Sequence, residues 1–154
     1  MTYAEDRTLQ YYRQQQHQPG WCDLLSVIIS GMLTNAGEKE SQTFLTHMGD
    51  TLAGHYPLEV ATTVGELETQ INRLLASFDW GVIDIQPQEN AMIIDHLALP
   101  AGSGILPDEQ WQRAMAAVLT GLYARWLRDQ GGHEHVSLTV ETTSNVALRF
   151  RYKA

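Results

Sequence analysis

Apolar side chains recur every three or four residues through the first half of the chain, which is the spacing of helices. Pro19-Gly20 is expected to end the first helix, and Asp23 to cap the second. The second helix is rich in aliphatic residues, ends at Gly37 and is expected to be buried. A capping box, Thr63 with Glu66, opens the last helix. Four helices are therefore predicted, over residues 4–18, 23–37, 38–55 and 63–78.

The period then changes from about 3.6 to 2, which predicts strands rather than helices. Two hairpins follow, one turning through a loop at 87–90 and the other through a three-residue loop at 143–145. The apolar side chains of each hairpin fall on one face. The predicted same-face partners are Ile83 with Ile94, Ile85 with Met92, Val140 with Leu148, Leu138 with Phe150 and Val136 with Tyr152.

The longest helix is predicted between the two hairpins, opened by Pro107 and closed by Gly131-Gly132. Its apolar face is too broad for a single contact, so we expect it to pack against the sheet and against a second surface. The whole chain, 1–154, reads as a single α+β domain. A helical N-terminal half is followed by hairpin, helix and hairpin, which form an antiparallel sheet covered by helices.

Composition narrows the functional classes. The chain has 154 residues and a formal charge of -8, with acids in excess in both halves. Binding to nucleic acid or to an anionic membrane is disfavoured, because both need a basic surface. The longest apolar stretch, residues 24–33, is too short to span a bilayer, and the N-terminus does not resemble a secretory signal. We expect a cytoplasmic protein in which the lone Cys22 is a small buried hydrophobe.

The sequence offers no strong catalytic, cofactor-binding or metal-binding motif. The glycine-containing segment 101–104 lacks the third glycine and the setting of a nucleotide site, so it is expected to be a connector. His133 and His135 lack further ligands at the spacing of a zinc site and are expected to lie in a surface turn. Arg149, Arg151 and Lys153 form a basic stripe that is expected to be solvated.

Asp84 and Asp95 form the only acid pair that suggests an enzyme. Both are expected on the polar face of the first hairpin, diagonally placed, with Cβ atoms about 7–8 Å apart. Glycoside hydrolysis needs two carboxylates at such a separation. Because this face lacks aromatic subsites apart from Trp80, a glycan-active enzyme is kept only as the least favoured interpretation.

Aromatic side chains suggest two further candidate surfaces. Stacking of aromatic rings and hydrogen bonding by planar amides are both used to bind sugars. The first helix presents such side chains on a weakly apolar surface, either facing a glucan or packing against another subunit: Tyr3, Tyr11, Tyr12, Gln14, Gln15 and Gln16. The long helix carries a second set, expected in the core or at a subunit interface: Trp111, Tyr123 and Trp126.

The middle of the chain carries a family resemblance. Three segments, 71–81, 92–100 and 118–127, resemble the D-type subunit of the bacterial cellulose synthase operon. The most specific features are Trp80-Gly81 before the first strand and the run Gly121-Leu122-Tyr123-x-Arg125-Trp126. The resemblance covers residues 66–132.

This resemblance implies a non-enzymatic accessory subunit of cellulose synthesis that binds no cofactor. Such proteins form a ring of eight subunits, a tetramer of dimers, with passages through which β-1,4-glucan chains are thought to pass. The implied partners are further copies, proteins of the cellulose synthase complex and glucan. The implied location is cytoplasmic, beneath the inner membrane, with the periplasm as the alternative.

A different class of function also fits the order of elements. Helices followed by hairpin, helix and hairpin resemble the TRAPP-type domains that bind small molecules or lipids. A large enclosed apolar cavity would favour that alternative. An amphipathic first helix with little core of its own instead favours an oligomer.

Overall fold

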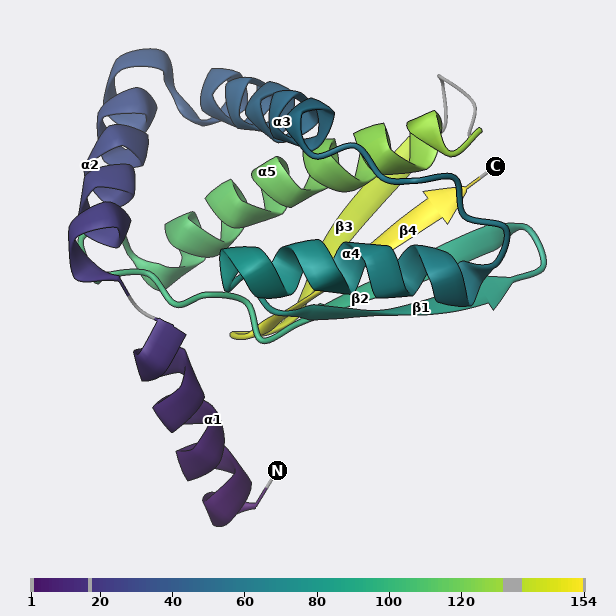
Figure 1. Ribbon diagram of the computed structural model, residues 1–154. Coiled ribbons are helices and arrows are strands. Elements are labelled where there is room, and N and C mark those ends of the chain that lie inside the picture. The colour runs from purple at the N-terminus through teal and green to yellow at the C-terminus, as the bar shows by residue number, and fades with distance from the viewer. Residues whose placement is uncertain (1, 17, 132–136, 154) are drawn as a thin grey trace.

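The structure, a computed structural model, describes residues 2–16, 18–131 and 137–153. These residues form helices and a four-stranded antiparallel sheet (Figure 1), which confirms the predicted α+β class. The elements in chain order are α1 (Tyr3–Gln16), α2 (Pro19–Ala36), α3 (Glu38–His55), α4 (Val64–Phe78), β1 (Val82–Gln88), β2 (Ala91–Leu97), α5 (Asp108–Asp129), β3 (Ser137–Ser144) and β4 (Ala147–Lys153).

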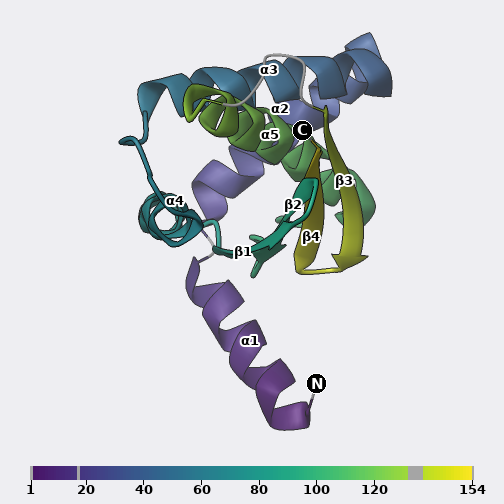
Figure 2. The ribbon, with the colours of Figure 1, turned by 90° about the vertical axis from the view of Figure 1, so that its right-hand side faces the viewer.

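Helix α5 lies between the sheet and α3 (Figures 1 and 2). The strands are ordered β1-β2-β4-β3, and one face of this sheet contributes Ile94 and Phe150 to the core. Tyr123 of α5 meets Phe150 edge to face, with ring centroids 5.1 Å apart. The broad apolar face of α5 is therefore used on two sides, as predicted. The opposite face of the sheet carries polar side chains such as Asp84 and Thr139.

Glycines bring α3 and α5 into backbone contact where they cross. A Cβ atom added at Gly121 would lie 1.8 Å from the Thr46 carbonyl oxygen, and one at Gly49 would lie 1.9 Å from the Val118 carbonyl oxygen. Ion pairs lie farther along the same crossing, where Asp50 accepts from Arg125 (3.2 Å) and from Arg128 (3.1 Å). The absence of two side chains thus sets the distance between these helices.

Helix α2 differs most from the prediction. It begins at Pro19, so this residue opens α2 as well as separating it from α1, and Asp23 lies inside the helix rather than capping it. The prediction of a buried helix is wrong. Ser26 and Ile29 are buried on the side toward α3, but most of the other aliphatic side chains are exposed.

Both hairpins have the predicted faces but not the predicted register. Ile85 lies opposite Ile94, and Val140 lies opposite Phe150, each a shift of two residues. The cause is turn length, because each turn has only two residues, 89–90 and 145–146. A shift of two returns every side chain to the same face, so the core is unaffected. Val136 lies outside the described residues, and Tyr152 pairs instead with Leu138.

The predicted capping box of α4 is present in altered form. The Thr63 hydroxyl accepts a hydrogen bond from the Glu66 backbone N–H (3.1 Å). The Glu66 carboxylate accepts from the backbone N–H and the hydroxyl of Thr62, at 2.8 and 2.9 Å, rather than from Thr63. These hydrogen bonds hold the pKa of Glu66 below its ordinary value. Both threonines therefore fix the start of the helix.

Candidate functional site

Helix α1 projects away from the rest of the molecule (Figures 1 and 2). Tyr3, Tyr11 and Tyr12 are exposed along it, and the rings of Tyr11 and Tyr12 meet edge to face with centroids 5.6 Å apart. Gln15 is also exposed. Gln14 and Gln16 belong to the same helix, but their side chains lie outside the described part of the structure. The helix thus presents aromatic rings and at least one amide to the solvent.

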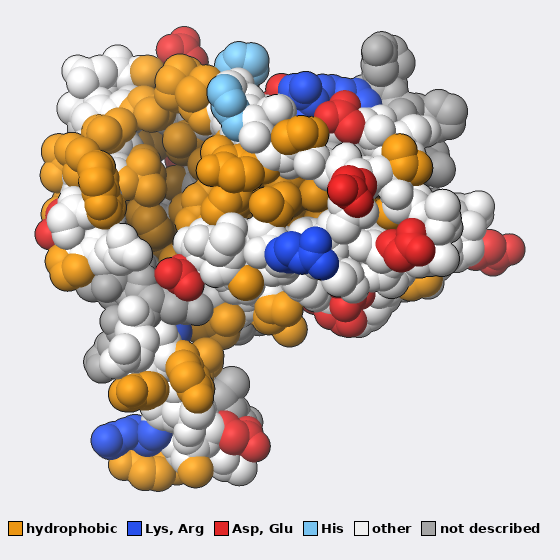
Figure 3. Space-filling model, viewed as in Figure 1, with side chains coloured by type: hydrophobic (Ala, Val, Ile, Leu, Met, Phe, Trp, Pro, Cys, Tyr) orange, Lys and Arg blue, Asp and Glu red, His pale blue; other side chains and the backbone are white. Residues whose placement is uncertain are grey.

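A large apolar surface lies on α2, next to α1. Hydrophobic side chains gather over this part of the molecule in Figure 3, beside a hollow. Trp21 is 73% exposed and Ile28 is 51% exposed. Five residues form this surface, which we call the α2 face: Trp21, Leu24, Leu25, Val27 and Ile28. Among the described residues no element covers it, although a monomer rarely leaves so many large apolar side chains together.

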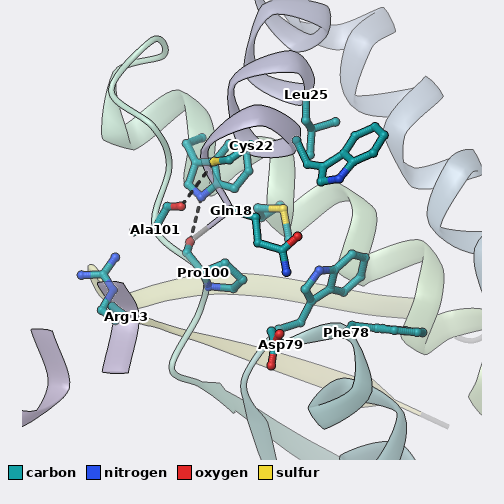
Figure 4. A pocket seen from close by; sticks show the side chains of 12 residues that line it. Arg13, Gln18, Cys22, Leu25, Phe78, Asp79, Pro100 and Ala101 are labelled. Carbon is teal, nitrogen blue, oxygen red and sulfur yellow. Dashed lines mark hydrogen bonds between the residues drawn. The ribbon is translucent and has the colours of Figure 1, made fainter. Parts of the chain in front are cut away.

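A pocket of about 200 Å³ opens at the foot of α2 (Figure 4). Its lining comes from the end of α1, the start of α2, the turn before β1, the loop after β2, and α5. Gln18 lies over the hollow, with Asp79 and Phe78 below it. The pocket residues used below are Arg13, Gln18, Trp21, Asp79 and Trp80. Its mixture of indole rings and polar groups suits a sugar better than a lipid tail.

Two hydrogen bonds hold the wall of this pocket. Trp111 Nε1 donates to the Pro100 carbonyl (2.8 Å), and Cys22 Sγ donates to the Ala101 carbonyl (3.8 Å). Burial, followed by the nearby charge of Asp23, raises the pKa of the Cys22 thiol. The thiol therefore stays protonated at neutral pH and acts as a weak donor rather than as a nucleophile.

The three aromatic residues singled out on the long helix lie inside the single chain. Trp111, Tyr123 and Trp126 are all buried in the core. Trp126 Nε1 donates to the Tyr56 carbonyl (2.9 Å), which ties α5 to the end of α3. These side chains therefore stabilise the subunit and present no surface to a second copy.

His96 is a buried polar residue that the sequence reasoning missed. Its Nε2 lies 2.7 Å from the Trp80 carbonyl, and its Nδ1 faces the Tyr123 hydroxyl. Since a carbonyl only accepts, Nε2 carries the proton and the hydroxyl donates to Nδ1. Burial lowers the pKa of His96 to about 4 and raises that of Tyr123 well above its ordinary value. The available signal was the alternation of β2, which places this imidazole beside Ile94 on the core face.

Asp84 and Asp95 lie directly opposite each other rather than diagonally, because of the register shift. Arg149 donates two hydrogen bonds to Asp95, at 2.7 and 3.1 Å, and Gln86 Nε2 donates to Asp84 at 3.0 Å. The first contact is a bidentate ion pair between neighbouring strands, which is a structural arrangement. Arg149 of the predicted basic stripe is thus engaged by Asp95, and Arg151 lies 3.7 Å from Glu141.

We expect the acid pair to have no part in catalysis. The Asp84→Asn/Asp95→Asn variant should lose about 1 kcal/mol of unfolding free energy, because Asp95 no longer pairs with Arg149. Chemical denaturation measures that loss, with Glu141→Gln as the control for a weaker strand ion pair. Reducing-sugar assays should find no hydrolysis of soluble glucan by either protein. Turnover that disappears in the double variant would contradict this expectation.

The remaining candidates add no chemistry to the described part of the chain. There, no three His, Cys, Asp or Glu side chains are grouped so that they could hold a metal ion. His133 and His135 lie outside the described residues. The segment 101–104 connects β2 to α5, with Gly102 against the Trp111 ring. None of the helices that the structure describes is long and apolar enough to cross a membrane.

Comparison with known proteins identifies the family. The family of the D-type subunit of cellulose synthase matches residues 7–153. Cellulose synthase operon protein D from Komagataeibacter xylinus and that from Komagataeibacter sucrofermentans are each 36% identical to this chain over 100 residues. Those segments cover 63% of this chain and 62% of each relative. A further Komagataeibacter xylinus protein of the same name is 37% identical over 73 residues, 46% of this chain and 45% of its own length. The resemblance of the middle segments is confirmed, and the chain belongs to the family of cellulose synthase operon protein D.

Proposed function

We propose that this protein is a non-enzymatic accessory subunit of bacterial cellulose synthesis that works as a ring of several copies. The observation that carries the proposal is the exposed α2 face beside a projecting α1. The relatives, which are named for the cellulose synthase operon, supply the process. Their aligned segments span 62% of their length, so the role of the whole relative comes to this chain as part of the proposal.

Assembly follows from the physical cost of the α2 face. Its half-exposed aliphatic and indole side chains resemble the core of a subunit interface, which is apolar and poor in charge. A symmetric oligomer would remove this surface from water. We propose dimers that join into an octamer, with the synthase complex as the partner. We place this assembly on the cytoplasmic side of the inner membrane, and cell fractionation would decide between that and the periplasm.

Glucan contact is proposed for α1 and the adjoining pocket. Tyr11 and Tyr12 offer ring faces and edges, and Gln15 and Gln18 offer amide groups, on one side of the molecule. A neutral glucan cannot be held by the net charge of -8. Stacking and amide hydrogen bonds are the remaining forces, and they allow a chain to slide. The ring would thus guide glucan chains or space the synthases that make them.

The small-molecule alternative gains no support from the pocket. A TRAPP-type function would use a large enclosed apolar cavity. The pocket at the foot of α2 is small, opens beside the exposed Trp21 and has Arg13, Gln18 and Asp79 in its lining.

Charging the α2 face should break the assembly. In Leu24→Asp/Ile28→Asp two carboxylates replace half-exposed apolar side chains, so the molar mass from light scattering should fall at least twofold. The control Thr34→Asp/Asn35→Asp adds the same charge at exposed polar positions of α2 and should assemble normally. In the parent bacterium with the gene deleted, the wild type and the control should restore the amount and order of cellulose, and the α2 variant should not. A wild-type monomer at micromolar concentration, or cellulose unchanged by the deletion, would overturn the proposal.

Removing the tyrosine rings of α1 should weaken glucan binding. For Tyr11→Ala/Tyr12→Ala we expect a loss of affinity for a cello-oligosaccharide on the order of tenfold, measured by calorimetry. The matched control Tyr11→Phe/Tyr12→Phe keeps both rings and should bind almost as tightly as the wild type. Equal affinity of all three proteins would remove α1 from the glucan path.

A further inference from the structure

The two edges of the sheet differ in how their backbone groups are satisfied. At the β1 edge, Asn72 of α4 accepts from the Ile83 N–H at 2.7 Å and donates to the Ile83 carbonyl at 3.0 Å. Glu68 accepts from the Ile85 N–H at 3.1 Å. These side chains take the place of a neighbouring strand, so helix α4 seals this edge.

The β3 edge has no such cover among the described residues. The strand, SLTVETTS, pairs with β4 on one side. Toward its open side we find one side-chain hydrogen bond to its backbone, from Gln112 Nε2 to the Ser144 carbonyl at 3.0 Å. The segment 137–142 contains no proline or lysine, the residues that usually protect an edge, and half of its residues are valine or threonine, which favour strands. It can therefore accept a further strand.

We propose that β3 pairs antiparallel with β3 of a second copy, across a two-fold axis perpendicular to the sheet. The two four-stranded sheets then form one continuous sheet. The bulge between Thr142 and Ser144 limits the pairing to the segment before it. This inference rests on the proposed function, because a ring built from dimers needs two different interfaces, and the α2 face supplies only one.

The sequence of β3 is complementary to itself. With the axis at Thr139 or at Val140, the core-facing side chains of Leu138 and Val140 meet apolar or threonine partners from the other copy. Val140, which is 40% exposed in the single chain, becomes covered. The Glu141 carboxylate then lies opposite Ser137 or Thr139 of the second copy. An axis at Glu141 would oppose two like charges and is excluded. A second copy thus fits better than an unrelated strand.

Disulfide trapping tests this pairing directly. In the full chain with Cys22→Ser, we expect Thr139→Cys or Val140→Cys to give covalent dimers on oxidation, since a residue near the axis faces its own copy. Gln86→Cys on the sealed β1 edge is the matched control and should give at least tenfold less dimer. Absence of dimer for both β3 variants, while the chain still assembles by light scattering, would overturn the inference.

A charge on the strand separates this interface from the α2 face. For Val140→Lys, in which the half-exposed side chain can extend to water, we expect unchanged circular dichroism and at least a twofold lower molar mass. The α2-face variant should keep the β3 cross-link, and combining both changes should leave a monomer. If Val140→Lys assembles as the wild type does, the β3 pairing is wrong while the proposed ring stands. If the wild type is a monomer that forms no cross-link, both proposals fail.

Discussion

Replacing Gly121 with alanine should destabilise the protein more than any other single methyl group added to a helix. The new Cβ atom would lie 1.8 Å from the Thr46 carbonyl oxygen and 2.9 Å from the Asp50 backbone nitrogen. Both neighbours are backbone atoms of α3, so they cannot move aside as a side chain would. We expect a loss of at least about 3 kcal/mol in the free energy of unfolding, or failure to fold, measured by chemical denaturation.

Gly31→Ala provides the matched control for this prediction. Gly31 also lies within a helix, α2, but a Cβ atom there meets nothing within 4 Å. The substitution should raise stability by about 0.5–1 kcal/mol, because alanine favours a helix over glycine. Equal stability of the Gly121→Ala and wild-type proteins would mean that α3 and α5 do not cross in backbone contact.

Such a crossing could not be predicted from the sequence. The run that contains Gly121 indicates a helix and a broad apolar face, and both are present. Which helix packs on that face depends on Gly49, far earlier in the chain, and no local pattern connects the two glycines. The periodic part of the fold was therefore predictable, whereas the helix that covers α5 was not.

Strand faces were predictable for a similar reason, and strand registers were not. The alternation of β1 and β2 puts Ile83, Ile85 and Ile94 on one side whatever the turn length. The register depends on the turn, and Glu89-Asn90 and Asn145-Val146 turn in two residues where longer loops were expected. This shift placed Asp95 opposite Asp84 and beside Arg149, which converted a possible catalytic pair into an ion-paired strand contact.

The candidate site was only partly predictable. The tyrosines of α1 were found because they stand on a helix with few apolar neighbours of its own. The α2 face was missed, because an aliphatic helix such as α2 is typical of a core, and the sequence cannot distinguish the core of one chain from the interface of several. Assembly resolves that ambiguity, because a helix exposed in the subunit can still be buried in the functional unit.

Acid should weaken the fold through His96, the second large effect that we expect. Its ordinary pKa is 6.5, which is the value in the unfolded chain, and burial lowers the pKa in the folded chain to about 4. Between these values the unfolded chain binds a proton that the folded chain refuses. The stability of the folded state is thus full above pH 6.5 and declines as the pH falls toward 4. The shift corresponds to a loss of about 3 kcal/mol at its largest.

The variant His96→Gln isolates this contribution from that of the carboxylates. A glutamine amide can donate to the Trp80 carbonyl and accept from the Tyr123 hydroxyl without binding a proton, so the two groups keep partners at every pH. Denaturation midpoints between about pH 7 and about pH 4.5 should therefore fall more steeply for the wild type than for His96→Gln. His47→Gln, at an exposed position of α3, should follow the wild type. Parallel curves for wild type and His96→Gln would mean that the imidazole is not held neutral between β2 and α5, and that the hydrogen bonds to Trp80 and Tyr123 do not set its protonation.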